Sequence, residues 1–404
     1  MSDTARSGAL AGFKVIDLTR VLGGPYCTQI LSDYGAEVIK IEPPQGDEVR
    51  DWGPPFKDGL SAYFAGVNRN KRSVALDLRQ EAGREVLVRL LEDADVLIEN
   101  FKVGTLAKWN LGYEEVLAQR FPRLIYCTIT GFGANGPFGG FPGYDAVVQA
   151  LAGDISINGS AESGSIRIGT PLVDLGTGLY AAIGILAAAE ERRRSGKGQR
   201  VDATLFDTGV ALLHPHAANY FMSGKTPRLT GNSHPNISPY DQYPTKKGNI
   251  FLGIGNDRQF RILCEELGKP ALTQDPRFLH NPERVENRAA LNAELTILLA
   301  DHEAEDISSR LLARGAPAGA VLTVPEVMEH PHTTAREMTV ELDGYRGTGM
   351  ALKFGRTPGG VQGKPPLFGT STREVLAEAG YSATEIDDMF AQGIALDERQ
   401  KPPA

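Results

Sequence analysis

An aspartate directly ahead of a helix of small residues is the first candidate for chemistry in this sequence. Asp174 lies in the segment 170–176, and the stretch 176–194 is predicted to be a helix crowded with Ala and Gly. Aspartate is among the best helix caps, so a purely structural role is the first interpretation. A carboxylate at a helix N-terminus is also kept ionised and aimed, as a nucleophile must be. We therefore predict that Asp174 is an N-cap, a catalytic nucleophile, or both.

Two glycine-rich loops could hold or enclose a substrate. Residues 21–25 (VLGGP) follow the first predicted strand, and Pro25 suits the first turn of a helix. This turn could bind a phosphate or a thioester arm, or it could be a plain strand-to-helix connection. Residues 131–136 match GxGxxG, but the prolines and glycines up to 143 exclude the helix that a dinucleotide site requires there. The loop 131–143 is instead predicted to be a lid or a long connector.

Histidine and cysteine side chains do not predict a metal site. His214 and His216 form a close pair without a third ligand at a plausible spacing, and His234 stands alone in a turn-rich loop. The three cysteines are far apart in apolar contexts, which is typical of a reducing compartment (Cys27, Cys127, Cys264). No GxSxG, Walker A, HExxH or paired CxxC motif occurs, so serine hydrolases, P-loop enzymes and zinc enzymes are not expected.

Charge and hydropathy patterning narrow the classes of partner. The net charge is −8, and basic residues form no stripe, so nucleic acid is not an expected partner. The basic run 192–194 is predicted to be a solvated helix end, or else a contact for a nucleotide phosphate. The apolar stretch 179–189 is too short and glycine-interrupted to span a bilayer, and the N-terminus has no apolar run of signal-peptide length. We expect a cytoplasmic protein without membrane contact.

Alternating β-rich and amphipathic stretches predict an α/β fold with a parallel sheet. Strands are predicted at 13–18, 37–41, 74–78, 96–99 and 124–130, with helices between them at 25–34 and 80–91. At 404 residues the chain is long enough for two domains. We predict a large domain over 1–224, a small domain over 225–325 with helices at 259–267, 285–299 and 304–314, and a C-terminal segment 326–404 that returns to the large domain. Residues 382–385 (SATE) predict a capping box there.

These segments together resemble the class III coenzyme A transferases, the CaiB/BaiF type, which includes formyl-CoA transferase and carnitine CoA-transferases. The resemblance runs nearly end to end. It is carried by residues 15–19 (VIDLT), 23–25 (GGP), 35–42 (GAEVIKIE), 70–73 (NKRS), 95–101 (DVLIENF), 143–145 (GYD) and the segment around Asp174.

The resemblance implies roles for particular residues. Asp174 matches the aspartate that attacks the acyl-CoA, and the positions that hold the nucleotide and pantetheine of CoA correspond to Val21, Leu22, Leu76, Arg79, Asn100, Phe101 and Lys108. It also implies a Rossmann-like large domain built from both chain ends and an interlocked homodimer. Acyl-CoA and a carboxylic acid would be substrates, with no permanently bound cofactor and no metal.

Departures from the family pattern bear on the subclass. Racemases of the family carry a histidine base where this chain has Tyr144, and tyrosine, with a reference pKa near 10, is a poor substitute. Formyl-CoA transferase has a lysine where this chain has Thr130, so oxalate is not the first expected acid. We therefore expect CoA transfer through an aspartyl anhydride and an aspartyl-CoA thioester. The alternatives are an α-methylacyl-CoA racemase and a non-catalytic CoA-binding protein.

The expected acids are dicarboxylates, with succinyl-CoA as donor. The second carboxylate would meet basic or polar side chains, for which the candidates are Arg50, Arg69, His234 and Arg258.

Overall fold

Two compact units make up the chain. The computed structural model describes residues 7–400. Unit 1 contains the chain up to 154, residues 168–214 and the chain from 331 onward, and unit 2 contains 155–167 and 215–330. Unit 2 is larger than the small domain predicted at 225–325. It also contains helix α10 (His216–Ser223) and the segment 155–167.

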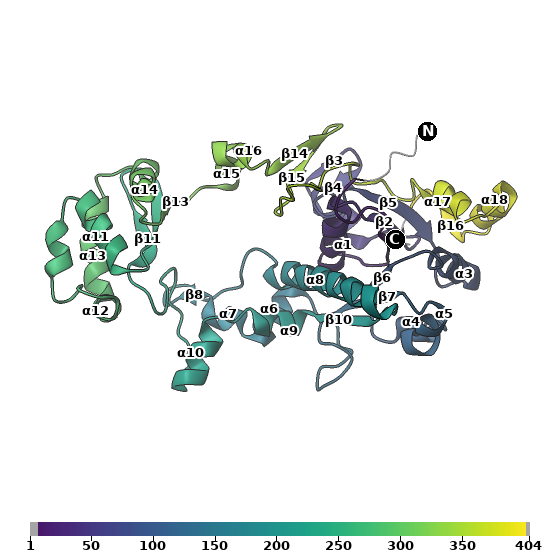
Figure 1. Cartoon of the computed structure of the whole chain (residues 1–404), viewed down its shortest axis with the longest axis horizontal. Helices are drawn as coiled ribbons and strands as arrows, with labels where there is room; N and C mark the ends of the chain where they lie inside the picture. The colour runs from purple at the N-terminus through teal and green to yellow at the C-terminus, as the bar shows by residue number, and fades with distance from the viewer. Residues whose placement is uncertain (1–6, 401–404) are drawn as a thin grey trace. The chain divides into compact units, whose positions relative to one another are not determined.

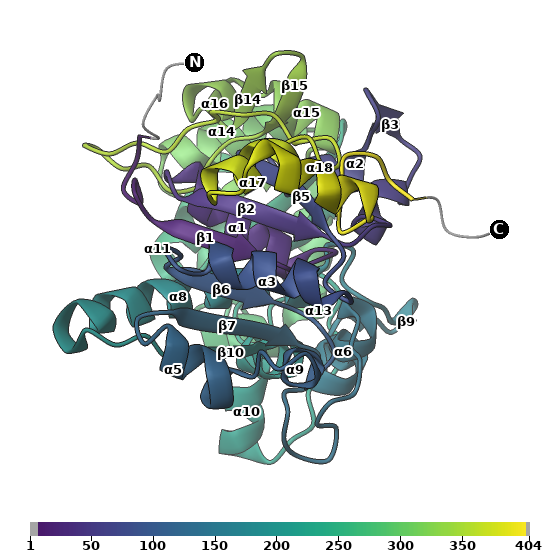
Figure 2. The same cartoon turned by 90° about the vertical axis from the view of Figure 1, so that its right-hand side faces the viewer.

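A seven-stranded sheet forms the centre of unit 1 (Figures 1 and 2), in the order β10-β7-β6-β1-β2-β5-β16. All strands run parallel except β16, which pairs antiparallel with β5. The bounds are β1 (Lys14–Asp17), β2 (Glu37–Glu42), β5 (Lys71–Leu76), β6 (Val96–Glu99), β7 (Ile125–Thr130), β10 (Arg200–Thr204) and β16 (Ala395–Leu396). The predicted parallel, Rossmann-like sheet is confirmed, and β16 places the end of the described chain on its edge.

Alternation along the strands divides the core of unit 1 into two layers. On β1, Val15 packs in one hydrophobic cluster and Ile16 in the other, as a period of two residues requires. The Val15 layer includes side chains of α1 (Gly23–Asp33) and α8 (Leu172–Ser195), and the Ile16 layer those of α3 (Glu81–Leu90), α17 (Thr372–Glu378) and α18 (Ala383–Ala391). Helix α18 begins with the predicted Ser382–Glu385 capping box.

Helix α8 is longer than the apolar stretch in the sequence indicated. It has 24 residues and, by length and composition alone, could cross a membrane, a test that core helices also pass. The helix predicted at 176–194 is confirmed, with a start four residues earlier and an end one residue later. The separate prediction that its apolar part is too short to span a bilayer was wrong, because the apolar part extends beyond 179–189. In unit 1, α8 packs on α1 so closely that a Cβ on Gly178 would lie 2.5 Å from the Gly23 carbonyl oxygen. Arg192 is buried and pairs with Asp95 at 2.6 Å, so the basic run is not entirely solvated.

Shorter elements complete unit 1. They are η1 (Glu48–Asp51), β3 (Phe56–Lys57), β4 (Leu60–Ser61), α2 (Ala62–Ala65), α4 (Thr105–Lys108), η2 (Tyr113–Leu117), α5 (Ala118–Arg120), α6 (Asp145–Ala152), α9 (Leu205–Ala211), α16 (Pro331–Ala335), β14 (Thr339–Leu342) and β15 (Tyr345–Thr348). Most of them lie in the connections that follow the carboxyl ends of the strands, where parallel sheets place their ligand sites.

Unit 2 has its own core. A three-stranded antiparallel sheet, β11 (Tyr240–Pro244), β12 (Asn249–Gly253) and β13 (Ala318–Ala320), shares one hydrophobic cluster with α11 (Asp257–Glu266), α13 (Arg288–Leu299) and α14 (Ala304–Ala313). The three predicted helices of this region are therefore present. The remaining elements are α7 (Asp154–Ile157), β8 (Gly159–Ser160), β9 (Gly164–Ser165), η3 (Pro270–Gln274), α12 (Asn281–Glu286) and α15 (Val324–Glu329).

Candidate active site

Asp174 lies in the first turn of α8, but a different aspartate caps that helix. The main-chain N–H groups of Val173 and Asp174 donate to Oδ1 of Asp145, at 2.9 and 3.2 Å. Gln149 holds the other oxygen of Asp145 through an Nε2–Oδ2 bond of 2.6 Å. The N-cap interpretation of Asp174 was therefore wrong, because Asp145, 29 positions earlier, does that work. Among the described residues, the Asp174 side chain accepts no hydrogen bond and so remains available to a substrate.

The environment of Asp174 disfavours its charged form. Burial, and then the nearby negative charge of Asp145, raise the pKa of Asp174 to about 7. The expectation that the helix N-terminus keeps this carboxylate ionised was incomplete, because desolvation and a like charge oppose it. Burial, followed by the charge of Asp174, also raises the pKa of Tyr63 on α2 to about 12, so this phenol stays protonated near the site. A carboxylate with a pKa near 7 is more basic than an ordinary one, which favours nucleophilic attack once it is ionised.

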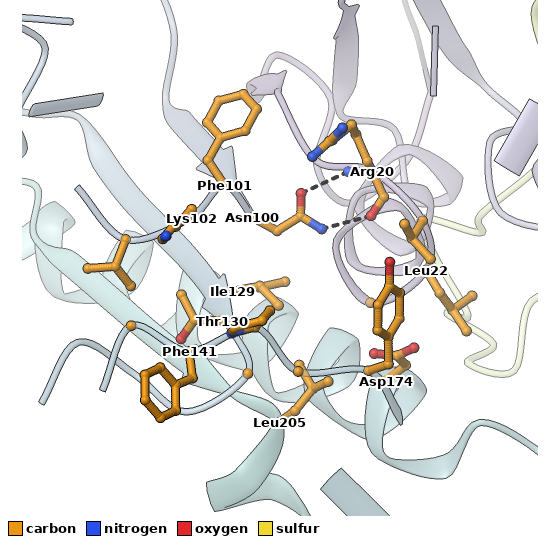
Figure 3. Close-up of a pocket in the computed structure, with 18 of the residues that line it drawn as sticks. Arg20, Leu22, Asn100, Phe101, Lys102, Ile129, Thr130, Phe141, Asp174 and Leu205 are labelled. Carbon is orange, nitrogen blue, oxygen red and sulfur yellow. Dashed lines mark hydrogen bonds between the residues drawn. The ribbon is translucent and has the colours of Figure 1, made fainter. Parts of the chain in front are cut away.

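A cavity of about 320 Å³ in unit 1 has Asp174 in its wall (Figure 3). Six segments line it: the turn after β1, the start of η1 at Glu48, the segment after β6, the end of β7 with the loop that follows, the start of α8 and the start of α9 at Leu205. Of the residues predicted to hold CoA, the cavity contains Val21, Leu22, Asn100 and Phe101. The structure thus brings the predicted nucleophile and four predicted CoA residues to one site at the carboxyl edge of the sheet.

Long-range contacts fix the turn after β1. Asn100 accepts the main-chain N–H of Arg20 at 2.9 Å and donates to its carbonyl oxygen at 2.7 Å. Val21 has φ of +70°, a strained value for a β-branched residue, and its N–H donates to Asp47 at 3.2 Å. Lys40, fully buried, holds the other oxygen of Asp47 at 2.9 Å. Residues at the 20–23 turn are therefore held rigidly at the cavity wall.

The other predicted CoA residues lie outside this cavity. Leu76 is fully buried in the core at the end of β5. Arg79 is exposed and pairs with Asp77 at 2.8 Å, and Lys108 is exposed at the end of α4. Their proposed contacts with CoA remain predictions.

Sequence reasoning missed Asp145 and Arg20 as residues of the site. Asp145 stands in the GYD segment that already supported the family resemblance, and this was the signal that could have identified it. Arg20 lines the cavity but precedes the glycine-rich turn and belongs to no motif.

Two of the arginines expected to receive a carboxylate are already paired. Arg50 binds Glu42 at 2.7 Å and Arg69 binds Asp33 at 2.6 Å, all four side chains being buried. His234 and Arg258 belong to unit 2. Within residues 7–400, no group of three or more His, Cys, Asp or Glu side chains is placed to hold a metal ion.

The loop 131–143 folds back on itself. A Cβ on Gly131 would lie 2.6 Å from the Gly143 nitrogen, so only glycine lets the two ends of the loop meet. Inside the loop, the Gly140 N–H donates to the Gly133 carbonyl at 2.9 Å. Helix α6 begins only at 145, as the prolines predicted, so the GxGxxG pattern does not form a dinucleotide cradle. Phe141, 61% exposed, lies against the cavity and contributes an apolar wall.

Known proteins resemble this chain over nearly its whole length. The family CoA-transferase family III matches residues 10–372. The chain is 39% identical over 385 residues to the succinate–glutarate CoA-transferase of Agrobacterium fabrum, covering 92% of this chain and 96% of the relative. It is also 39% identical over 349 residues to the acetyl-CoA:oxalate CoA-transferase of Acetobacter aceti, covering 86% and 89%. A solved structure of a CAIB/BAIF family protein from Brucella suis has a TM-score of 0.84 at 41% identity and covers 93% of this chain and 100% of that one. The chain therefore belongs to CoA-transferase family III, the CaiB/BaiF type.

Proposed function

We propose that this enzyme transfers CoA from succinyl-CoA to a dicarboxylic acid, with Asp174 as the covalent nucleophile. The observation that carries the proposal is the Asp174 carboxylate, unbonded among the described residues, in the wall of a cavity shared with Val21, Leu22, Asn100 and Phe101. The acids named for the two relatives, glutarate and succinate in one and oxalate in the other, are all dicarboxylic. The oxalate relative and the glutarate relative have the same overall identity to this chain, 39%.

The proposed reaction conserves the energy of the thioester. An oxygen of Asp174 attacks the carbonyl carbon of the donor, the carbon–sulfur bond breaks, and CoA leaves as a thiolate, giving a mixed anhydride. The thiolate then attacks the Asp174 carbonyl and expels the donor acid, which leaves an aspartyl-CoA thioester. The acceptor carboxylate repeats these steps in reverse order and restores Asp174.

The main-chain N–H groups at the start of α8 are not free to stabilise the oxyanions of this reaction. The N–H groups of Val173 and Asp174 are already bound to Asp145. Helix α1, which begins at Gly23 in the cavity wall, has no side-chain cap, and the N–H groups of Gly23 and Gly24 have no acceptor within residues 7–400. A Cβ on Gly23 would lie 3.1 Å from the Asp174 carbonyl oxygen, so the two helix starts are close. We therefore assign the oxyanion-binding role to the start of α1.

Covalent trapping tests this mechanism directly. Protein incubated with succinyl-CoA and no acceptor, then quenched with hydroxylamine, is expected to carry a hydroxamate at Asp174 in peptide mass spectra. A parallel incubation with acetyl-CoA tests a second donor. Turnover assays with glutarate, oxalate and acetate as acceptors, without hydroxylamine, then identify the acids. Absence of any adduct at Asp174 with every donor would end the proposal of covalent catalysis. Deuterium exchange at the α-carbon of an acyl-CoA without an acceptor would instead indicate the racemase.

We also propose that the enzyme is an interlocked homodimer. Helices α6, α8 and α9 contact one another and expose several large apolar side chains, an unusual surface for a monomer (Val147, Leu151, Leu179, Tyr180, Ile183, Leu186, Val210). A second copy of the chain would cover them.

The dimer is tested by light scattering after size exclusion. The wild type is expected at twice the chain mass of 43.5 kDa, and Ile183→Glu is expected to lower the soluble yield or the dimer fraction. Substitution of the exposed Arg373 by Glu is the control, because it lies on α17, away from this surface. A fully active wild-type monomer would contradict the assignment.

A further inference from the structure

Arg20 presents a cation to the cavity without a protein partner. It lines the same cavity as Asp174, and its Nε is buried with no hydrogen-bond acceptor (Figure 3). Nor does the Arg20 side chain form an ion pair with any residue that the structure describes. A buried donor on a charged group is costly to leave unpaired. The missing acceptor is therefore to be sought in a ligand.

Arg20 is half-buried as a residue, with its Nε atom buried, and the four arginines that are buried as whole residues are all paired with carboxylates. Arg50 binds Glu42 at 2.7 Å, Arg69 binds Asp33 at 2.6 Å, Arg192 binds Asp95 at 2.6 Å and Arg284 binds Asp257 at 2.7 Å. The fold thus supplies a counter-charge where an arginine has a structural role. Arg20 differs from these four arginines because no carboxylate of the described residues pairs with it, and it lines a cavity.

The main chain of Arg20 is fixed, so its side chain starts from a defined position. Asn100 binds both the N–H and the carbonyl oxygen of Arg20, at 2.9 and 2.7 Å. The next residue, Val21, is held by Asp47 through its N–H. Only the side-chain torsions of Arg20 are left to be fixed when it binds a ligand, and the planar donors of its guanidinium suit two oxygens at once.

We propose that Arg20 binds a phosphate group of the CoA portion of the substrate. The proposal rests on the proposed function, in which an acyl-CoA occupies this cavity. Figure 3 shows Arg20 on the side of Asn100 and Phe101, with Leu22 between it and Asp174. The reacting carboxyl groups must meet at Asp174, whereas the phosphates lie at the far end of the pantetheine arm. Lys102, which also lines the cavity, adds positive charge. Phosphate oxygens match the paired donors of a guanidinium.

Binding measurements on CoA and on pantetheine test the assignment, because pantetheine has the thiol arm but no phosphate. Calorimetric titration of Arg20→Gln is expected to show a CoA dissociation constant about 10- to 100-fold above wild type, the effect of losing a charge-assisted hydrogen bond. The pantetheine dissociation constant is expected to stay within about 2-fold, since no phosphate is involved. Arg20→Lys keeps the positive charge but lacks the paired planar donors of a guanidinium, so its loss of CoA affinity should be intermediate. Arg373→Gln, an exposed arginine on α17 paired with Asp387, is the matched control and should bind as wild type.

Three results would overturn the assignment. The first is CoA binding by Arg20→Gln and by Arg20→Lys at wild-type affinity. The second is an equal loss for CoA and pantetheine. The third is a rise in KM for glutarate and succinate with no change in KM for acetyl-CoA, which would make Arg20 a receptor for the acid instead. Wild-type protein that binds no CoA would reject the proposed function itself, so the two failures are distinguishable. Thermal melting of each variant shows whether it is folded. If Arg20→Gln does not fold, the CoA affinity of Arg20→Lys still tests the assignment.

Discussion

Replacement of Asp174 by asparagine is expected to lower CoA transfer at least about 10³-fold, because the amide cannot form the anhydride. Turnover of succinyl-CoA with glutarate, measured at pH 8, gives the result. The variant is expected to remain folded, since the Asp174 side chain accepts no hydrogen bond from the described residues and asparagine has nearly the same volume. Binding of CoA should persist, because the cavity residues that would hold CoA are unchanged.

The same substitution is expected to increase stability at high pH. The pKa of Asp174 is raised to about 7 in the folded protein, against about 4 for an ordinary aspartate, so the folded state binds its proton more tightly than the unfolded state. Stability due to this group is therefore fully present below pH 4 and is lost as the pH rises through 7. A shift of about three pKa units corresponds to at most about 4 kcal/mol. Asparagine avoids this loss, so thermal melts at pH 8 should show the variant above wild type.

These two measurements together separate a chemical role from a structural one. An inactive variant that melts at or above the wild-type temperature supports Asp174 as a nucleophile strained by its environment. An inactive variant that melts lower would indicate that the side chain supports the fold. Full activity of the variant would reject the mechanism.

The pH dependence of transfer is expected to report the ionisation of Asp174. Only the carboxylate attacks, so the rate at subsaturating succinyl-CoA should fall about tenfold per pH unit below 7 and level off above it. Asp145→Asn removes the like charge while Oδ1 can still accept the N–H groups of Val173 and Asp174. Its midpoint should therefore move to lower pH. Because burial is the larger cause of the raised pKa, the shift should be partial.

A second carboxyl group titrates in the same range and must be distinguished. Burial raises the pKa of Glu99 to about 7, although hydrogen bonds from the Tyr126 hydroxyl and the Phe101 N–H act to lower it. Glu99→Gln should leave the midpoint of the rate profile unchanged, and so should Asp388→Asn, an exposed position on α18. A midpoint that moves with Glu99 and not with Asp145 would show that Glu99 controls the profile.

The elements that carry the site could be predicted from local patterns. Runs such as 37–41 and 124–130 alternate or cluster β-branched residues, and their neighbours in sequence have helical periodicity. This pattern predicts a parallel sheet with helices on both faces. The structure places each strand start within three residues of the predicted one, and the starts at 37 and 96 coincide. Asp174 could also be singled out, because its helix-start setting and the surrounding family segments are both continuous in the sequence. By contrast, the start of α8 was placed four residues too late, at 176 instead of Leu172, because the cap that allows the helix to begin there comes from the distant Asp145.

What the sequence by itself determined is the α/β class, the parallel sheet and the candidate nucleophile, because each depends on neighbours a few positions apart. Tertiary structure alone decided the properties of that residue. Asp145 replaces Asp174 as the helix cap and raises its pKa from 29 positions away, and Asn100 fixes Arg20 from 80 positions away. Whether an arginine meets a carboxylate, as Arg69 does, or lacks one, as Arg20 does, likewise depends on which distant segments the sheet brings together. The charge and burial around a residue depend on segments that are distant in the sequence, so local periodicity cannot predict them.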